Sequence, residues 1–349
     1  MKTIRILPML MALGSIPGAA QTPLFMDGTA FGGSKVFSEG ISPLGNPARY
    51  DQPQPQPAVY ATYVEGDQRS KNSKAVFDEI GIGSGAVPVT SDQLRRLSES
   101  PWALRTRSFG VAFLDKTGNA SFTHEDQRSF LAFTDGNPLG NTYGDVRRSA
   151  VDRAAVGIGS FEQGTAIGFS LRIERWKLGT QTQFLNPMPS QLALSGGPNP
   201  FDFNAMPNTT TTAAIDFGFI YEVVPGVRIG GTLDRLNQKH LWDVYERPQM
   251  RLGLQADIGS LARLSVELDV NDAQRMPFPV NQRTAAVSLR VTANQSVTFV
   301  VGAERKKIGD AGIISAGASV QFRTASLLVG LGFQFGQDRP MKGATMVLN

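Results

Sequence analysis

The stretch Met250-Arg251-Leu252-Gly253-Leu254-Gln255-Ala256-Asp257-Ile258 alternates apolar residues with polar residues or glycine. After the short connection Gly259-Ser260-Leu261, a second alternating stretch, Ala262–Val270, follows. A period of two is typical of a β-strand with one apolar and one polar face. The two stretches therefore predict an antiparallel hairpin.

The same unit recurs toward the C-terminus. Further hairpin strands are expected in Ala285–Val291, Val297–Glu304, Ile314–Phe322 and Leu327–Phe335. Strands that follow one another through short turns are neighbours in an antiparallel meander. Either a closed barrel or a two-layer sandwich can be built from such a meander.

The N-terminus favours the barrel. A short basic start, Met1–Arg5, precedes the apolar run Ile6–Ile16 and the small residues Gly18–Ala20. This order predicts that residues 1–20 are a secretory signal peptide. An exported chain of alternating strands is typical of a bacterial outer-membrane protein. We therefore expect an all-β fold, a transmembrane antiparallel up-and-down β-barrel of about 14 strands, over residues 58–349.

Composition excludes several classes of protein. The chain has 349 residues and no cysteine, so disulfides, thiolate metal sites and cysteine nucleophiles are absent. There are 34 Lys and Arg against 30 Asp and Glu, and loss of Lys2 and Arg5 with the signal peptide nearly balances the two. Such a balance does not indicate nucleic-acid binding. No cofactor is expected.

The polar face of the strands is expected to line the lumen. A charged side chain facing the middle of the bilayer costs roughly 2–4 kcal/mol, so the apolar set must face lipid. Both signs of charge are present, which favours an ion-paired, partly filled lumen over a charge-selective pore. The expected lumen-lining residues are Arg172, Glu174, Asp216, Glu222, Arg228, Asp234, Arg251, Asp257, Arg263, Glu267, Asp269, Arg290 and Glu304.

The first half of the chain is organised differently. Residues 21–57 are rich in glycine and proline and are expected to form a plug-like segment that contains the motif Asn46-Pro47-Ala48. Residues 72–98 have helical character between the first two strands. Residues 183–212 lack alternation and carry five prolines, which predicts the longest loop, placed at the outer mouth of the barrel.

These segments carry a family resemblance. The Gly-rich start Gly28–Gly33 and the Asn46-Pro47-Ala48 motif resemble the beginning of long-chain fatty-acid-transporter-like (FadL-like) barrels. The patterns Ile229–Leu233, Arg247–Gly253 and Val301–Glu304 resemble the conjugal transfer (TraF-like) proteins of F-plasmid transfer operons, as does Glu267-Leu268-Asp269. The resemblance spans most of the mature chain through short patterns.

The resemblance implies an outer-membrane barrel with outer-membrane lipid around it. Its further partners would be a hydrophobic small molecule that it takes up, or the proteins of a transfer or secretion apparatus. Two features depart from the pattern. The chain ends Met346-Val347-Leu348-Asn349 without a terminal aromatic residue, so either Leu327–Phe335 or Gly343–Leu348 can close the barrel. In addition, the acidic residues that often precede the Asn-Pro motif are reduced here to Glu39.

Enzyme chemistry has little support in the sequence. The two histidines, His124 and His240, have no second ligand at metal spacing, and no GxSxG motif occurs. A lipase with His124 as base is a minor alternative. We expect a non-enzyme and keep three functional classes open: a transport barrel for hydrophobic solutes, a structural or assembly barrel with a sealed lumen, and a secreted soluble β-sandwich.

Overall fold

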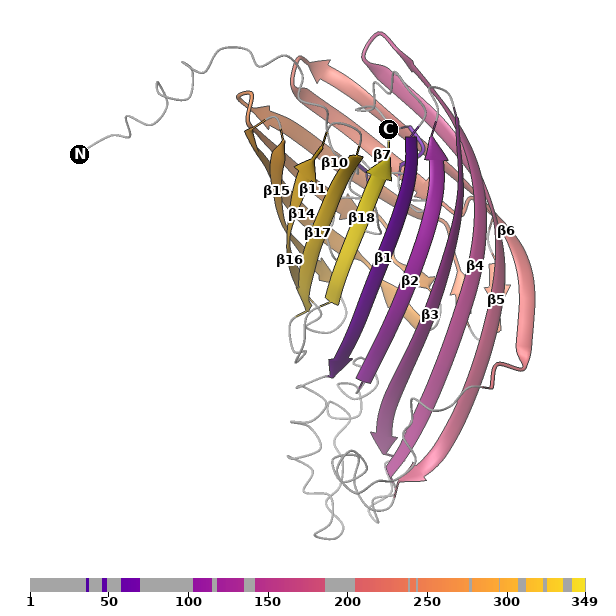
Figure 1. Ribbon diagram of the computed structural model, residues 1–349. Coiled ribbons are helices and arrows are strands. Elements are labelled where there is room, and N and C mark those ends of the chain that lie inside the picture. The colour runs from indigo at the N-terminus through magenta and orange to yellow at the C-terminus, as the bar shows by residue number, and fades with distance from the viewer. Residues whose placement is uncertain are drawn as a thin grey trace, which may run out of the picture.

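The computed structural model places a sheet that closes on itself to form a barrel (Figure 1). The residues that the structure describes are 36–37, 46–48, 58–69, 103–114, 118–134, 142–185, 205–237, 239–242, 244–275, 278–294, 296–306, 312–322, 325–334 and 341–348. No helix in this part of the chain is long and apolar enough to cross a membrane.

Fourteen antiparallel strands form the wall of the barrel. In order around the wall they are β1 (Ala58–Arg69), β2 (Ala103–Leu114), β3 (Gly118–Thr134), β4 (Thr142–Glu162), β5 (Thr165–Leu185), β6 (Asn208–Val224), β7 (Val227–Asp234), β10 (Gln249–Ile258), β11 (Ala262–Asp269), β14 (Thr284–Asn294), β15 (Val297–Lys306), β16 (Gly312–Gln321), β17 (Ala325–Gln334) and β18 (Met341–Leu348). Two small hairpins stand apart from the wall: β8 (Lys239–Leu241) with β9 (Val244–Glu246), and β12 (Ala273–Arg275) with β13 (Phe278–Gln282).

The last strand closes the ring. β18 pairs with β17 on one side and with β1 on the other, in a register that runs from Val59 opposite Leu348 to Glu65 opposite Lys342. The closing strand is therefore the one that contains Gly343–Leu348, whereas β17 lies one place inside the meander. The barrel prediction is confirmed, and the β-sandwich alternative is wrong because the sheet has no second layer and no free edge.

Alternation along the strands explains this architecture. In the β10–β11 hairpin, Leu252 lies opposite Leu268 and Leu254 opposite Val266, and all four side chains are exposed on the outer face. The interleaved Gln255 is only 2% exposed. Because side chains alternate between the two faces of a sheet, one register places every apolar residue outside and every polar one inside.

The wall is much longer on one side than on the other. β4 and β5 have 21 residues each, whereas β7, β11 and β18 have 8 each. Figure 1 shows the long strands β3 to β6 running side by side past the end of the short ones. At the opposite end, the β4–β5, β6–β7 and β10–β11 connections are tight turns, in which Gly164, Gly226 and Gly259 supply positive φ angles.

The expected boundaries of the longest loop were too wide. β5 continues to Leu185 and β6 begins at Asn208, so both ends of the expected 183–212 loop belong to strands. β3 runs without interruption from Gly118 to Thr134. The expected helices of 72–98 lie outside the described residues, as does most of the expected plug-like segment.

Candidate functional site in the barrel interior

The inner face of the long wall carries buried charges. On β5, the outward residues Ile167, Phe169 and Ile173 are 44%, 49% and 55% exposed, whereas the inward Arg172 and Glu174 are 1% and 0% exposed. Burial of an ionised group is tolerated only where the group is paired and hydrogen-bonded. The barrel interior therefore holds the candidate functional residues.

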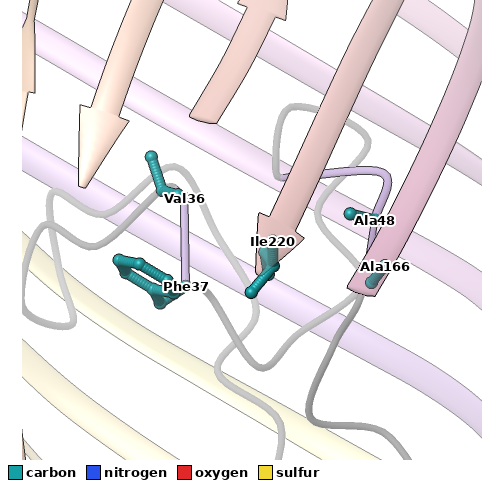
Figure 2. Close-up of a cluster of buried hydrophobic side chains, with 5 residues drawn as sticks. All are labelled: Val36, Phe37, Ala48, Ala166 and Ile220. Carbon is teal, nitrogen blue, oxygen red and sulfur yellow. The ribbon is translucent and has the colours of Figure 1, made fainter. Parts of the chain in front are cut away.

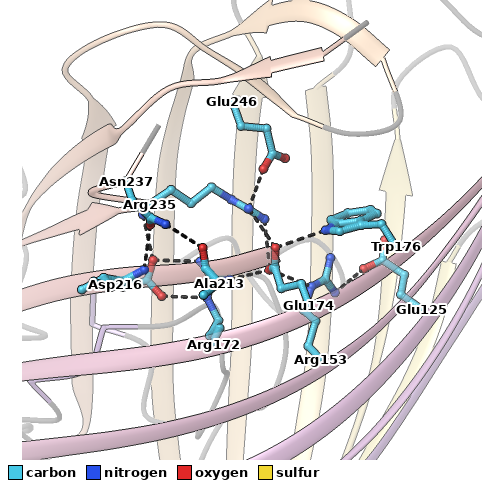
Figure 3. A network of polar contacts seen from close by, with 11 residues as sticks. Glu125, Arg153, Arg172, Glu174, Trp176, Ala213, Asp216, Arg235, Asn237 and Glu246 are labelled. Atoms are coloured by element: carbon cyan, nitrogen blue, oxygen red, sulfur yellow. Dashed lines mark hydrogen bonds and ion pairs between the residues drawn. The ribbon is translucent and has the colours of Figure 1, made fainter. Parts of the chain in front are cut away.

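Glu174 is the centre of the first interior network (Figure 3). Arg235, in the segment after β7, donates from its two terminal nitrogens to the two oxygens of Glu174 at 2.9 and 3.1 Å. Trp176 Nε1 donates to the same carboxylate at 3.2 Å. Arg153 from β4 and Arg172 from β5 complete the surroundings at 3.4 and 3.6 Å. Three guanidinium groups and an indole thus converge on one buried carboxylate.

Asp216 and Glu246 extend this network to neighbouring elements. Arg172 holds Asp216 on β6 through two contacts of 2.7 and 2.8 Å. The backbone N–H of Arg235 also donates to Asp216, at 2.8 Å, and the Arg235 guanidinium contacts Glu246 on β9. The β8–β9 hairpin is in addition anchored by Leu241, which is buried with Val151 and Trp176 against the inner wall. Ionic and apolar contacts together fix this hairpin to β4 and β5.

A second network lies on β10 and β11. Arg251 holds Asp269 at 2.6 and 3.2 Å, and Gln249 donates to Asp269 at 2.9 Å. The backbone N–H of Thr284 donates to the same carboxylate at 2.8 Å. Arg251 also lies 3.8 Å from Glu267.

A third group of charges lies toward the short turns. Arg228 donates to Gln255 at 3.0 Å and lies 3.3 Å from Asp257. Arg263 donates to Asp257 at 2.7 Å, and Glu222 lies 3.8 Å from Arg228. All three groups cross from strand to strand, so they tie the wall of β4 to β11 together on the inside.

The Asn46-Pro47-Ala48 motif lies against the inner wall. Asn46 Nδ2 donates to the carbonyl oxygens of Val36 at 2.9 Å and Phe219 at 3.3 Å, while its Oδ1 accepts the N–H of Ala48 at 2.9 Å. A methyl group on Gly168 would collide with the Pro47 carbonyl, and one on Gly218 with the Asn46 side chain. Glycine is therefore required on β5 and β6 for this close approach.

Val36 and Phe37 are held in the same way. Their backbone N–H groups donate to one oxygen of Glu267, at 3.0 and 3.2 Å. A Cβ on Gly253 would lie 2.7 Å from the Phe37 ring, and one on Gly230 would lie 2.9 Å from Val36. Figure 2 shows Val36 and Phe37 together with the buried Ala48, Ala166 and Ile220, which form an apolar cluster inside the barrel.

The other side of the inner wall is lined by small residues that are also shielded. Ser315 and Ser319 on β16 are each 2% exposed, and Thr345 on β18 is 0% exposed. The Thr62 hydroxyl on β1 lies 3.1 Å from that of Thr345, across the closing seam. Side chains that faced a wide water-filled channel would be more exposed than these serine and threonine residues are.

The expected lumen residues fall into these networks unequally. Arg172, Glu174 and Asp216 meet in one network, as do Arg251, Glu267 and Asp269 in another. Those that lie elsewhere are Asp234, buried on β7; Arg290, on β14 directly opposite Arg263; and Glu304, on β15 opposite Ala286.

Sequence reasoning missed Arg153, Arg235 and Glu246, whereas Gln255 belongs to the polar face that was expected to line the lumen. Arg153 stands at an inward position of β4, so the alternation itself could have identified it. Arg235 and Glu246 lie at or beyond strand ends, where alternation gives no signal.

The histidines do not form a catalytic site in the described part of the chain. His124 lies on the outer face, where its Nδ1 is 2.6 Å from Asp152 Oδ1 and its ring is 5.2 Å from that of Phe109. Phe109 and Asp152 are also its two cross-strand neighbours, so no serine stands opposite this imidazole on either side. His240 stacks on Tyr245 in the β8–β9 hairpin, with ring centroids 4.3 Å apart.

A closed 14-strand barrel with an apolar outer face is a fold that the chain shares with solved transporters and channels. No protein-family model matches the chain. No curated protein matches it either.

Several solved structures share the fold at low sequence identity. The toluene transporter TodX of Pseudomonas putida is 11% identical, with 92% of this chain and 96% of that one covered and a TM-score of 0.55. The toluene transporter TbuX of Ralstonia pickettii is 10% identical, with coverage of 93% and 97% and a TM-score of 0.55. A FadL homologue of Pseudomonas aeruginosa is 11% identical, with coverage of 95% and 98% and a TM-score of 0.50. At such identities the likeness establishes the fold, and the resemblance to conjugal transfer proteins finds no support among these structures.

Proposed function

We propose that the protein is a non-enzymatic barrel of the bacterial outer membrane that passes a small hydrophobic solute through its lumen. The membrane location is supported by the exposed apolar outer face and by the signal-peptide-like N-terminus. The channel role is supported by the fold, which this chain shares with proteins described as hydrocarbon transporters.

The observation that carries the transport role is the apolar cluster of Figure 2. Val36, Phe37 and Ala48 meet Ala166 and Ile220 of the wall inside an otherwise polar interior. Displacement of Val36, Phe37 and Ala48 from the wall would uncover an apolar surface within the barrel. An apolar solute would bind there in place of the displaced side chains, which is the way a plugged barrel admits a solute without becoming an open pore.

Uptake of a radiolabelled monoaromatic hydrocarbon by cells that lack their own hydrocarbon channels tests this function. We expect cells that produce the protein to take up the label faster than cells with an empty vector. Asn46→Ala removes the side chain that joins Val36 to Phe219, and it should alter uptake, whereas Ser315→Ala on the far inner wall should not. Equal uptake with the protein and with the empty vector would reject the transport role.

A second candidate is a structural or assembly barrel with a sealed lumen, for instance within a transfer or secretion apparatus. The mutual neutralisation of Arg172, Glu174, Asp216 and Arg235 favours it, since such a lumen presents neither a cation path nor an anion path. This candidate predicts neither hydrocarbon uptake nor ion conductance, even when the Asn46 contacts are removed.

A further inference from the structure

The outer face of β5 changes character partway along the strand. Ile167, Phe169, Leu171 and Ile173 are all exposed apolar residues, and the next two outward positions are Arg175 and Lys177. The apolar part spans about 20 Å along the strand at about 3.4 Å per residue. This is close to the apolar band of roughly 25 Å in outer-membrane barrels.

The same change occurs at matching positions on the neighbouring strands. Outward residues become charged at Glu65 on β1, Arg107 on β2, Asp126 on β3 and Asp152 on β4. The register aligns most of them, since Glu65 lies opposite Arg107, Arg107 opposite Asp126, and Asp152 opposite Arg175. Between β3 and β4 the row shifts by one outward position, because Asp126 lies opposite Ala150 and Asp152 opposite His124. A charged row therefore borders the apolar band on this side of the barrel, at the end away from the tight turns.

Each carboxylate of this row already has a partner. Glu65 lies 3.1 Å from Arg107, and Asp126 lies 2.8 Å from Arg148. Asp152 stands opposite Arg175, but its carboxylate contacts His124 at 2.6 Å.

The two cations of β5, Arg175 and Lys177, differ from the other charges of the row. Among the described residues, neither Arg175 nor Lys177 forms an ion pair. Their cross-strand neighbours on β6 are Thr211 and Thr209, whose side chains are exposed on the same outer face. Arg175, Lys177, Thr209 and Thr211 thus form a patch, the donor patch, in which every polar group can donate a hydrogen bond.

We propose that the donor patch binds the phosphate of a lipid headgroup in the outer leaflet of the outer membrane. The patch continues the outer face directly from the apolar band, so the molecule whose acyl chains cover Ile173 has its headgroup at Arg175. Two cations and two hydroxyl groups complement a phosphate, which binds through charge-assisted hydrogen bonds. This proposal rests on the proposed function, because it requires the apolar band to lie in a membrane.

Native mass spectrometry of the folded protein in dodecyl maltoside, titrated with lipid A, tests the proposal. The variant Arg175→Gln/Lys177→Gln should bind lipid A about 30-fold more weakly, because each cation near an anionic lipid surface contributes about 1 kcal/mol and about 1.4 kcal/mol corresponds to a factor of ten. Arg107→Gln is the matched control, since this arginine lies in the same row but is already paired with Glu65, and it should leave binding nearly unchanged.

Three outcomes would overturn the proposal: unchanged lipid A affinity in the double variant, equal binding of dephosphorylated lipid A, or complete displacement of lipid A by inorganic phosphate, which would indicate a site for a free anion. If the double variant does not fold, Thr209→Val/Thr211→Val replaces it, and a several-fold weaker affinity is then expected. Heat-modifiability of each variant on a gel reports folding separately. A wild type that is extracted without detergent would reject the membrane location itself, whereas a folded, membrane-bound wild type that ignores lipid A would reject only the headgroup site.

Discussion

Arg235 holds Glu174 through two parallel hydrogen bonds of 2.9 and 3.1 Å, although the two residues are 61 positions apart in the chain. The pair joins the segment after β7 to the middle of the inner face of β5, and both side chains are buried. Removing one member of such a pair is costly, because the other charge then stays buried without a partner.

Arg235→Ala is therefore expected to destabilise the barrel by about 3–5 kcal/mol. The temperature at which the compact band disappears on a heat-modifiability gel measures this loss. Arg107→Ala is the comparison, because the Arg107 side chain is 60% exposed and surface pairs contribute at most about 1 kcal/mol. Equal losses in the two variants would contradict the structural role of the Glu174 network.

Gly168→Ala should loosen the N-terminal segment without unfolding the wall. The new methyl group would meet the backbone carbonyl of Pro47, which cannot rotate away as a side chain can. Ion conductance in planar bilayers should rise relative to the wild type. Gly159→Ala is a graded control, since a Cβ there would lie 3.1 Å from the same carbonyl and needs only a small adjustment. Unchanged conductance in Gly168→Ala would argue against the close contact between Pro47 and β5.

Leu254→Arg tests whether the outer face is in contact with lipid. Leu254 lies in the middle of the outward row of β10 and is 49% exposed. A charge at the bilayer midplane costs about 2–4 kcal/mol, falling to about 0–1 kcal/mol near the interface. Denaturant titration of folding into phospholipid vesicles should show the larger loss for Leu254→Arg and the smaller one for Ile258→Arg, at the turn end of the strand. In a water-exposed barrel the two variants would behave alike.

Deletion of residues 341–349 should abolish the compact band on a gel. Without β18, the paired edges of β1 and β17 lose their common partner and the sheet cannot close. Removal of Asn349 alone should have no such effect, because the described pairing of β18 with β1 is carried by Lys342 to Leu348. A compact band from the nine-residue deletion would mean that β17 can close the ring in place of β18.

Alternation in the sequence predicted the strands and the direction of their faces, whereas the signal-peptide-like N-terminus was needed to favour a barrel over a sandwich. The prediction failed where a strand has no alternation of apolar and polar residues. Asn208–Thr212 has four successive threonines and was expected to be loop, yet it forms the start of β6. Beyond the apolar band the outer face of the strand is polar as well, so no alternation is present there.

The contacts that Asn46 makes with the inner wall could not be predicted, for a different reason. Its amide donates to the carbonyl of Phe219, 173 positions away, and the fit depends on Gly168 and Gly218 lacking a side chain. Every residue has a backbone carbonyl, so the amino-acid type at position 219 does not reveal that its carbonyl accepts a hydrogen bond from Asn46. The motif itself was visible in the sequence, but its partners were not.

The 3.1 Å contact between the hydroxyls of Thr62 and Thr345 spans 283 positions and belongs to the seam that joins β1 to β18. The first wall strand thus finds its second neighbour only when the end of the chain arrives. Until then both β1 and the growing opposite edge have unpaired N–H and C=O groups, which can recruit strands from other chains. Closure over so large a separation is slow because the loop entropy must be overcome before any contact forms. Folding of the chain therefore has to protect two open edges for the whole time that the ring is incomplete.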